Sequence, residues 1–235
     1  MIDFHTHILP NIDDGSKSVE ETFNLIKEAE TAGFDTIIST SHYMEEYFET
    51  SNEEKRIWIN TLNQKLKEQN INVQLYLGNE IFINDHIVEG ITENKIYTLN
   101  NSKYLLFELP FHNQILGLAD IVYEMKVQGY IPILAHPERY SYFQENYKLV
   151  DELKEEGLLF QCNYASILGF YGKEAEKLLK YMLKNEYVDY LGTDIHHINK
   201  TYVTDNFKKI EKMFNKIASK EYYQEIITNG DNLVK

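Results

Sequence analysis

The sequence of 235 residues contains a single cysteine and no long hydrophobic run. One cysteine excludes an intramolecular disulfide framework and is typical of a protein that stays in a reducing cytoplasm. The longest apolar runs, near Tyr104–Phe107 and Ile131–Ala135, have the length of strands, whereas a membrane span needs about 18 apolar residues. The first residues also lack the basic and apolar regions of a signal peptide. We therefore expect a cytoplasmic protein that does not insert into a membrane.

Basic residues are scarce compared with acidic ones. The chain has 23 Lys and Arg against 37 Asp and Glu, which gives a formal net charge of −14. A field of that sign opposes non-specific binding to nucleic acids and to anionic membranes. It also repels a phosphorylated substrate, unless positive charge is concentrated locally.

The chain shows no low-complexity segment, linker or internal repeat, and its 43% hydrophobic residues are enough for a sizeable core. Short apolar runs predict strands at Ile2–Thr6, Thr36–Ser41, Val73–Asn79, Tyr104–Glu108, Ile131–His136, Leu158–Asn163 and Val188–Asp194. Amphipathic stretches between them predict helices at Val19–Ala32, Glu53–Glu68, Ala119–Gln128, Tyr147–Glu156, Lys173–Asn185 and Asn206–Ser219. Repeated strand–helix alternation predicts an α/β fold with a parallel sheet or barrel. We expect one domain over residues 1–235.

Side chains that can bind metal ions lie at or just beyond the carboxyl ends of six predicted strands. They are His5, His7, Asp14, His42, Glu80, Glu108, His136, Asp194 and His196. One such histidine or acid is more often a structural or solvated residue. In a parallel barrel, however, these strand ends meet at one face, where such folds place their active sites. The joint pattern therefore predicts a metal centre.

The ligand types indicate which metals could bind. Imidazoles and carboxylates without thiolates suit Mn, Fe or Zn. Nine ligands suit about three ions, with a carboxylate such as Glu80 bridging them. Three divalent ions would concentrate positive charge at one site and reverse the local sign. Ions about 3.5–4 Å apart favour in-line attack of a metal-bridging hydroxide on phosphorus. Arg139, shortly after His136, has a guanidinium fork that can hold two phosphate oxygens.

Other phosphatase and hydrolase mechanisms lack their motifs. A cysteine phosphatase needs an arginine six residues after its cysteine, but Leu168 occupies that position after Cys162. We expect Cys162 to be an inert buried thiol. No nucleotide P-loop and no H-E-x-x-H helix occurs in the sequence. The remaining histidines, His86, His112 and His197, are interpreted as structural or rim residues.

Several short segments resemble the PHP (polymerase and histidinol phosphatase) superfamily of phosphoesterases. They are Met1–Pro10 followed by Asp13-Asp14-Gly15, then Ser39–His42, Gly78-Asn79-Glu80, Phe107–Pro110, Ala135–Arg139 and Gly192–His196. More narrowly, these segments resemble the bacterial manganese-dependent protein-tyrosine phosphatases linked to capsule and exopolysaccharide synthesis. They extend over nearly the whole chain and are jointly specific.

The resemblance implies a distorted, TIM-like (β/α)7 PHP barrel that holds three divalent ions, with Mn²⁺ favoured over Fe or Zn. It implies that His5, His7, Glu80 and Asp194 hold one ion, that Glu80, Glu108 and His136 hold the second, and that Asp14, His42 and His196 hold the third. It makes Arg139 the phosphate-binding residue, with His136 and His42 as further catalytic residues. The implied partner is a phosphotyrosyl protein, a bacterial tyrosine autokinase.

Two positions depart from the family pattern. Relatives carry a second arginine soon after the last histidine, where this chain offers only Lys200, a point charge without a bidentate fork. The segment Tyr43–Tyr47 is acidic where some relatives are basic. Both departures concern substrate choice.

Three alternatives to a tyrosine phosphatase remain open from the sequence. The first is a small-molecule phosphatase that acts on histidinol phosphate or a similar alkyl ester. The second is a metal-binding partner of the kinase without catalytic activity, and the third, disfavoured by the acidic composition, is a DNA exonuclease. The native metal and the oligomeric state also remain open.

Overall fold

In a computed structural model, the chain is described over residues 1–197 and 202–234, and its paired strands all run parallel. One sheet has the order β1-β2-β4, and the other has the order β3-β5-β6-β7-β8-β9. The strands are β1 (Ile2–Thr6), β2 (Thr36–Ser39), β3 (His42–Tyr43), β4 (Gln74–Leu77), β5 (Glu80–Phe82), β6 (Tyr104–Glu108), β7 (Ile131–Ala135), β8 (Leu159–Asn163) and β9 (Tyr190–Gly192). The expected α/β class with a parallel sheet is confirmed.

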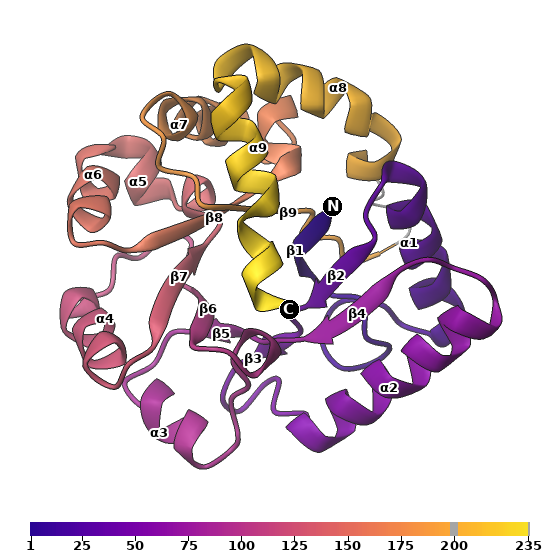
Figure 1. Cartoon of the computed structure of the whole chain (residues 1–235). Helices are drawn as coiled ribbons and strands as arrows, with labels where there is room; N and C mark the ends of the chain where they lie inside the picture. Colours follow the sequence, from indigo (N-terminus) through magenta and orange to yellow (C-terminus); the bar gives the residue numbers. More distant parts are fainter. Residues whose placement is uncertain (198–201, 235) are drawn as a thin grey trace.

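The two sheets curl into one distorted barrel (Figure 1). The chain leaves the first sheet at the end of β2 and joins the second as β3, and it does the same from β4 to β5. If β2 with β3, and β4 with β5, are each counted as one interrupted strand, the barrel has the seven predicted strands. The circle closes where Thr6, at the end of β1, bridges in parallel to Ile195 just after β9. The expected distorted barrel is therefore confirmed.

The breaks between β2 and β3 and between β4 and β5 correct two predicted strands. The strand expected at Thr36–Ser41 ends at Ser39, and His42 begins β3 instead of ending a strand. Likewise, Glu80 begins β5, where it lies directly beside His42 in the parallel register. Only two residues mark each break, Thr40-Ser41 and Gly78-Asn79, and the residue pattern alone did not separate the strands there.

The helices surround the barrel, except for the last one, which lies across one end (Figure 1). They are α1 (Val19–Ala32), α2 (Asn52–Glu68), α3 (Ile87–Thr92), α4 (Leu118–Val127), α5 (Ser141–Glu145), α6 (Lys148–Glu155), α7 (Lys173–Lys184), α8 (Tyr202–Ile217) and α9 (Lys220–Thr228). The six predicted helices are present: α1 has the predicted bounds, and the ends of the other five differ by up to four residues. In α1, the Ser18 side chain accepts a hydrogen bond from the backbone N–H of Glu21, and Gly33 ends the helix with φ 101°.

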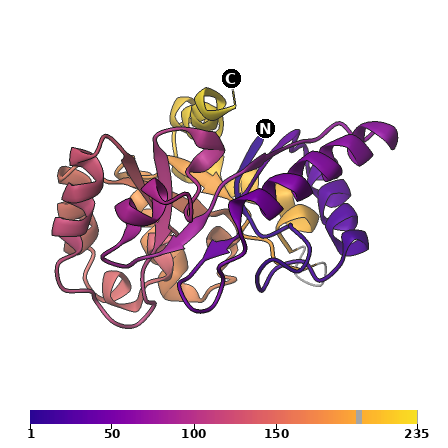
Figure 2. The same ribbon diagram turned by 90° about the horizontal axis from the view of Figure 1, so that it is seen from below.

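The C-terminal segment, for which no helix was predicted after Ser219, closes one end of the barrel. Helix α9 lies beside the N-terminus, at the end where the strands begin (Figure 2). The Asn229 side chain donates to the Asp189 carbonyl, and Leu233 is buried inside the barrel with Ile2. The opposite end, where the strands finish, carries the predicted site residues.

The core has two parts. Inside the barrel, a small cluster includes Ile2, Phe4, Leu106 and Tyr190, with the rings of Phe4 and Tyr190 stacked at 4.1 Å. A larger apolar cluster fills the space between the strands and the helices. This packing fixes the strand ends in space. Among the described residues, no helix combines the length and the apolar character that crossing a membrane requires.

Candidate metal centre

The two histidines at the end of the first strand, His5 within it and His7 just after it, lie together at the centre of the site. Their Nε2 atoms are 3.1 Å apart, and both are buried. The Oε2 atom of Glu80 lies 3.1 Å from Nε2 of His5 and 3.2 Å from Nε2 of His7. Three potential ligand atoms therefore converge, as expected from the spacing of His5 and His7 at the end of β1.

Glu80 contacts two further histidines from neighbouring strands. Its Oε2 atom lies 3.2 Å from Nδ1 of His42, and its Oε1 atom lies 2.7 Å from Nε2 of His136. Glu108 extends this group, with Oε1 at 3.3 Å from Nδ1 of His42 and Oε2 at 4.0 Å from Nε2 of His136. A carboxylate surrounded by four imidazoles has the position that a bridging ligand needs.

A third group lies at the solvent side of the cluster. Oδ1 of Asp14 is 3.5 Å from Nε2 of His42 and 3.4 Å from Nε2 of His196. The Asp14 side chain is 57% exposed, so this side of the cluster is open. Ligand atoms of His7, Asp14, His42 and His196 all lie within 4.8 Å of one another.

The observed groups overlap more than the sets that the resemblance implies. His7 belongs to the group around Glu80 and also to the group around Asp14. His42 presents Nδ1 to Glu80 and Glu108 and Nε2 to Asp14. The structure thus brings all nine predicted side chains together, while the partition among separate ions remains a prediction.

Asp194 connects the cluster to Arg139. Its Oδ1 atom lies 3.7 Å from Nε2 of both His5 and His7 and 3.5 Å from Nδ1 of His196. Its Oδ2 atom accepts a hydrogen bond of 2.6 Å from Nη1 of Arg139. The guanidinium therefore lies at the edge of the cluster.

Opposite charges shift the pKa values within the cluster. Burial disfavours the charged imidazole of His5, but Glu80 and Asp194 outweigh burial and raise the pKa of His5 to about 9. Burial also opposes the charge on His42, yet Glu80 and Glu108 raise its pKa to about 10. Against its own burial, Glu80 has a pKa held well below the usual range by His5 and His42. Protonated His5 and His42 therefore balance the nearby carboxylates in the absence of metal.

The backbone is strained at two of the predicted ligands. His136 has φ 33° and Asp194 has φ 54°, in the left-handed region that residues other than glycine rarely adopt. Such positions cost about 1–3 kcal/mol each and cluster at functional sites. Gly192 allows a close approach beside them, because a Cβ atom there would lie 2.5 Å from Cβ of His5. These features support a functional role for this end of the barrel.

Residues that the sequence analysis did not assign orient the predicted ligands. Oδ2 of Asp13 lies 2.9 Å from Nδ1 of His7 and accepts a 2.9 Å hydrogen bond from the backbone N–H of His42. Oε1 of Gln161 lies 2.7 Å from Nδ1 of His5, and the Asn163 side chain donates to Oδ2 of Asp194 at 2.8 Å. Gln161 and Asn163 are polar residues two apart at the end of β8, which was a signal available in the sequence.

The donor set fits divalent metal ions. Imidazole nitrogens and carboxylate oxygens from six strand ends face one another in a mostly buried space. Metal-binding histidines commonly use their other ring nitrogen to contact a carboxylate or carbonyl oxygen, as His7 and His5 do with Asp13 and Gln161. Without cations, buried carboxylates so close together would be costly. These observations make the cluster a good candidate for a multinuclear centre.

The remaining predicted residues lie as follows. Lys200 falls outside the described residues. Cys162 is buried, and burial raises the pKa of its thiol well above the usual range, which agrees with an inert cysteine. Nδ1 of His197 lies 3.4 Å from Oε1 of Glu21 on α1, and His86 is exposed.

Arg139 borders a cavity of about 190 Å³ beside the cluster. Its guanidinium carbon lies 4.7 Å from the ring centre of Phe111 and 4.4 Å from that of Tyr171. Asp14, Asp194 and His196 also line this cavity. The cavity is therefore lined both by Arg139 and by three of the predicted metal ligands.

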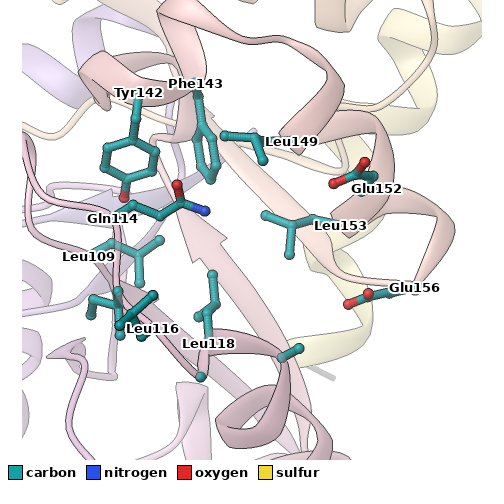
Figure 3. Close-up of a pocket in the computed structure, with 13 residues that line it drawn as sticks. Leu109, Gln114, Leu116, Leu118, Tyr142, Phe143, Leu149, Glu152, Leu153 and Glu156 are labelled. Carbon is teal, nitrogen blue, oxygen red and sulfur yellow. The ribbon is translucent and has the colours of Figure 1, made fainter.

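A larger cavity of about 290 Å³ lies elsewhere, between the start of α4, α5 and α6 (Figure 3). Leu109, Leu118, Phe143 and Leu153 form its walls, and Glu152 lies at one side. None of the predicted ligands and no arginine lines this cavity. The phosphate chemistry is therefore expected at the smaller cavity.

The family described as "Capsular polysaccharide synthesis, CpsB/CapC" matches residues 1–235. The chain belongs to this family. CapC of Staphylococcus aureus is 34% identical over 226 residues, which cover 96% of this chain and 87% of CapC. The tyrosine-protein phosphatase YwqE of Bacillus subtilis is 29% identical over the same share of each chain. The sequence resemblance to the capsule-type phosphatases is thereby confirmed.

Two solved structures resemble this member of the CpsB/CapC family. One comes from work on YwqE of Bacillus subtilis and CpsB of Streptococcus pneumoniae, described as metal-dependent tyrosine phosphatases. It has a TM-score of 0.81 and 26% identity, covering 92% of this chain and 91% of the other. The histidinol phosphate phosphatase HISK of Lactococcus lactis has a TM-score of 0.61 and 16% identity, covering 92% and 93%. This second likeness shows the fold alone.

Proposed function

We propose that this CpsB/CapC family protein is a metal-dependent phosphatase that hydrolyses phosphotyrosine in proteins. The observation that carries the proposal is the position of Arg139, ion-paired to Asp194, which is one of nine converging histidines and carboxylates. YwqE and the pneumococcal CpsB, which are named tyrosine-protein phosphatases, support the same activity. Residues that bind cations and an arginine that binds anions together suit a phosphate ester.

The proposed cofactors are three divalent ions, with Mn²⁺ as the first choice and Fe or Zn as alternatives. His5, His7, Glu80 and Asp194 are proposed for one ion, Glu80, Glu108 and His136 for a second, and Asp14, His42 and His196 for a third. When bound, such ions lower the pKa of a water molecule and neutralise charge on the phosphate. The overlap of the observed groups around His7 and His42 supports closely spaced ions.

The chain's own residues perform two tasks in this proposal. Arg139 holds phosphate oxygens with the N–H groups that Asp194 does not occupy, and Asp194 keeps the guanidinium in place. Asp14 and His196 border the open side, through which a protein-borne side chain can enter. The leaving phenol has a pKa near 10 and departs more easily than an alkoxide. A strong general acid is therefore not required.

The proposed substrate protein is a bacterial tyrosine autokinase, and the proposed compartment is the cytoplasm. Membership in a capsule-synthesis family and the tyrosine phosphatase names of relatives support the phosphotyrosyl substrate. The exposed Asp14 side chain favours a protein substrate over a metabolite that needs an enclosing pocket.

One set of assays tests the proposed function. The purified protein is given a phosphotyrosyl peptide, the matching phosphoseryl peptide and histidinol phosphate, each with Mn²⁺ and after chelation. We expect Mn²⁺-dependent release of phosphate, fastest from the phosphotyrosyl peptide. A preference for histidinol phosphate would overturn the substrate, and full activity after thorough chelation would overturn the metal-dependent mechanism.

A further inference from the structure

Two adjacent aromatic residues, Phe170 and Tyr171, lie in a tight turn between the 3-10 helix η3 (Tyr164–Leu168) and α7. The glycines on either side of them have φ 73° and φ 98°, so the backbone is left-handed at both ends of the pair. The backbone N–H of Gly172 donates to the carbonyl of Gly169 at 3.0 Å, which closes the turn. The turn places both aromatic side chains along the cavity that contains Arg139.

Tyr171 is already engaged with the site residues. Its ring lies 4.4 Å from the guanidinium carbon of Arg139, and its hydroxyl donates to Oδ2 of Asp194 at 3.4 Å. Phe111 contacts the same guanidinium at 4.7 Å. Tyr171 therefore helps to hold Arg139 in position.

Phe170 has a different environment. Its side chain is 44% exposed, although it lines the same cavity as Arg139, Asp14 and His196. Its ring meets that of Tyr171 edge-on, at 5.1 Å and 86°. A partly exposed phenylalanine beside a charged cavity can still bury apolar surface when a ligand arrives. The partly exposed Phe170 thus borders the space in which an apolar group attached to a bound phosphate would lie.

The volume of the cavity limits the size of the apolar group that could bind beside Phe170. At about 190 Å³ it is smaller than the roughly 300 Å³ at which pockets for drug-sized ligands begin. Ala165 and Val203 add apolar surface near Phe170, whereas Arg139, Asp14 and His196 supply charge. The lining therefore suits a single small group with one apolar and one anionic end.

We propose that Phe170 and Tyr171 form the wall against which the aryl ring of the substrate packs while Arg139 holds the phosphate. This inference rests on the proposed phosphatase function and deepens it, because it assigns the preference for aryl over alkyl phosphate esters to Phe170. Aromatic pairs favour edge-to-face or offset contacts, and an alkyl chain cannot make them. Phe170 is then a specificity-determining residue, and Arg139 and the metal ligands serve both ester classes.

The test measures binding without turnover. Phenylphosphonate and methylphosphonate are titrated into the Mn²⁺-loaded protein by calorimetry, since their carbon–phosphorus bonds are not hydrolysed. We expect wild type to bind phenylphosphonate more tightly. Phe170→Ala should weaken phenylphosphonate binding about fivefold to tenfold, the loss of roughly one aromatic contact, and leave methylphosphonate binding unchanged. Phe170→Tyr should retain the preference.

The matched control is Tyr123→Ala, because Tyr123 is an aromatic residue with 70% exposure on α4 and does not line this cavity. It should leave both affinities unchanged. If Phe170→Ala does not fold, Phe170→Leu removes the ring while keeping apolar volume. Equal loss of both phosphonates, no loss of either, or no preference in wild type would overturn the inference.

Failure of this inference can be distinguished from failure of the proposed function. Wild-type hydrolysis of a phosphotyrosyl peptide together with an unaltered phenyl preference in Phe170→Ala would refute only the role of Phe170. Absence of metal-dependent hydrolysis of every phosphate ester would refute the function on which the inference rests.

Discussion

Nη1 of Arg139 lies 2.6 Å from Oδ2 of Asp194, whose other carboxylate oxygen faces His5, His7 and His196. One carboxylate therefore connects the anion-binding residue to the cation-binding cluster. This ion pair places the guanidinium where a phosphate could contact Arg139 and the cluster at once. Mutation of Arg139 should therefore affect the binding of phosphate separately from the binding of metal ions.

Arg139→Lys should reduce kcat/KM for a phosphotyrosyl peptide about 100-fold without changing the metal content. Lysine keeps the positive charge but loses the planar fork that holds two oxygens. Steady-state kinetics and elemental analysis check this outcome. Arg56→Lys is the control, because Arg56 lies on the surface of α2 near Glu53. Unchanged kinetics in Arg139→Lys would contradict the proposed role.

His136→Ala should reduce turnover to the level of the metal-free protein, whereas Cys162→Ser should leave kcat unchanged. Nε2 of His136 contacts Glu80 at 2.7 Å inside the cluster, but Cys162 is buried in β8. Replacing this buried thiol with a more polar hydroxyl should lower the free energy of unfolding by about 1–3 kcal/mol. Phosphatase assays and thermal unfolding test both variants. A folded but inactive Cys162→Ser would refute the metal-based mechanism.

Asp13→Asn should weaken metal binding roughly 10-fold to 100-fold. Asp13 orients His7 through Nδ1 and also accepts from the backbone of His42, so its loss affects two predicted ligands. Metal titration followed by calorimetry measures the effect. Asp35→Asn serves as the control, because Asp35 pairs with the N-terminus at 2.8 Å. Equal metal affinity in both variants would show that Asp13 does not support the centre.

Metal affinity should rise with pH, and metal loading should release protons. Without metal, His5 and His42 keep their protons up to pKa values of about 9 and 10, whereas a metal ligand must be a neutral imidazole. The heat of Mn²⁺ binding in buffers of different ionisation enthalpy measures the released protons. Binding that is independent of pH between about 6.5 and 9 would contradict this prediction.

The same pKa shifts determine the stability of the metal-free protein. Because the folded-state pKa values of His5 and His42 are raised above about 6.5, their contribution is fully present below that pH. It is lost as the pH rises through about 9 to 10. Chelation should therefore lower Tm more at pH 9 than at pH 6. Mn²⁺ at 100 times its Kd should raise the free energy of unfolding by about 2.7 kcal/mol.

Much of the fold could be predicted from the sequence because strand and helix patterns are local. The apolar run at Ile131–Ala135 and the helix that ends before Gly33 appear where they were expected. The same patterns could not predict the break between β2 and β3. That break depends on which neighbouring strand His42 joins, and an apolar run does not encode its partner.

The capping helix α9 was missed for a related reason. Its role depends on contacts with residues far away in the sequence, such as that between Asn229 and Asp189. The contacts of Asp13 with His42, of Gln161 with His5 and of Asn163 with Asp194 also join residues that lie far apart in the sequence. Sequence spacing within a single segment gives no measure of such distances.

The sequence by itself determined which chemical groups are present and which predicted strands they follow. Residue identity fixes the donor atoms, and the parallel alternation of strands and helices directs them to one face. Only the tertiary structure decided that Glu80 lies among four histidines, that His7 and His42 each belong to two groups, and that Arg139 lies between Phe111 and Tyr171. These relationships depend on the curvature of the barrel and on side-chain packing, which are set by the whole chain.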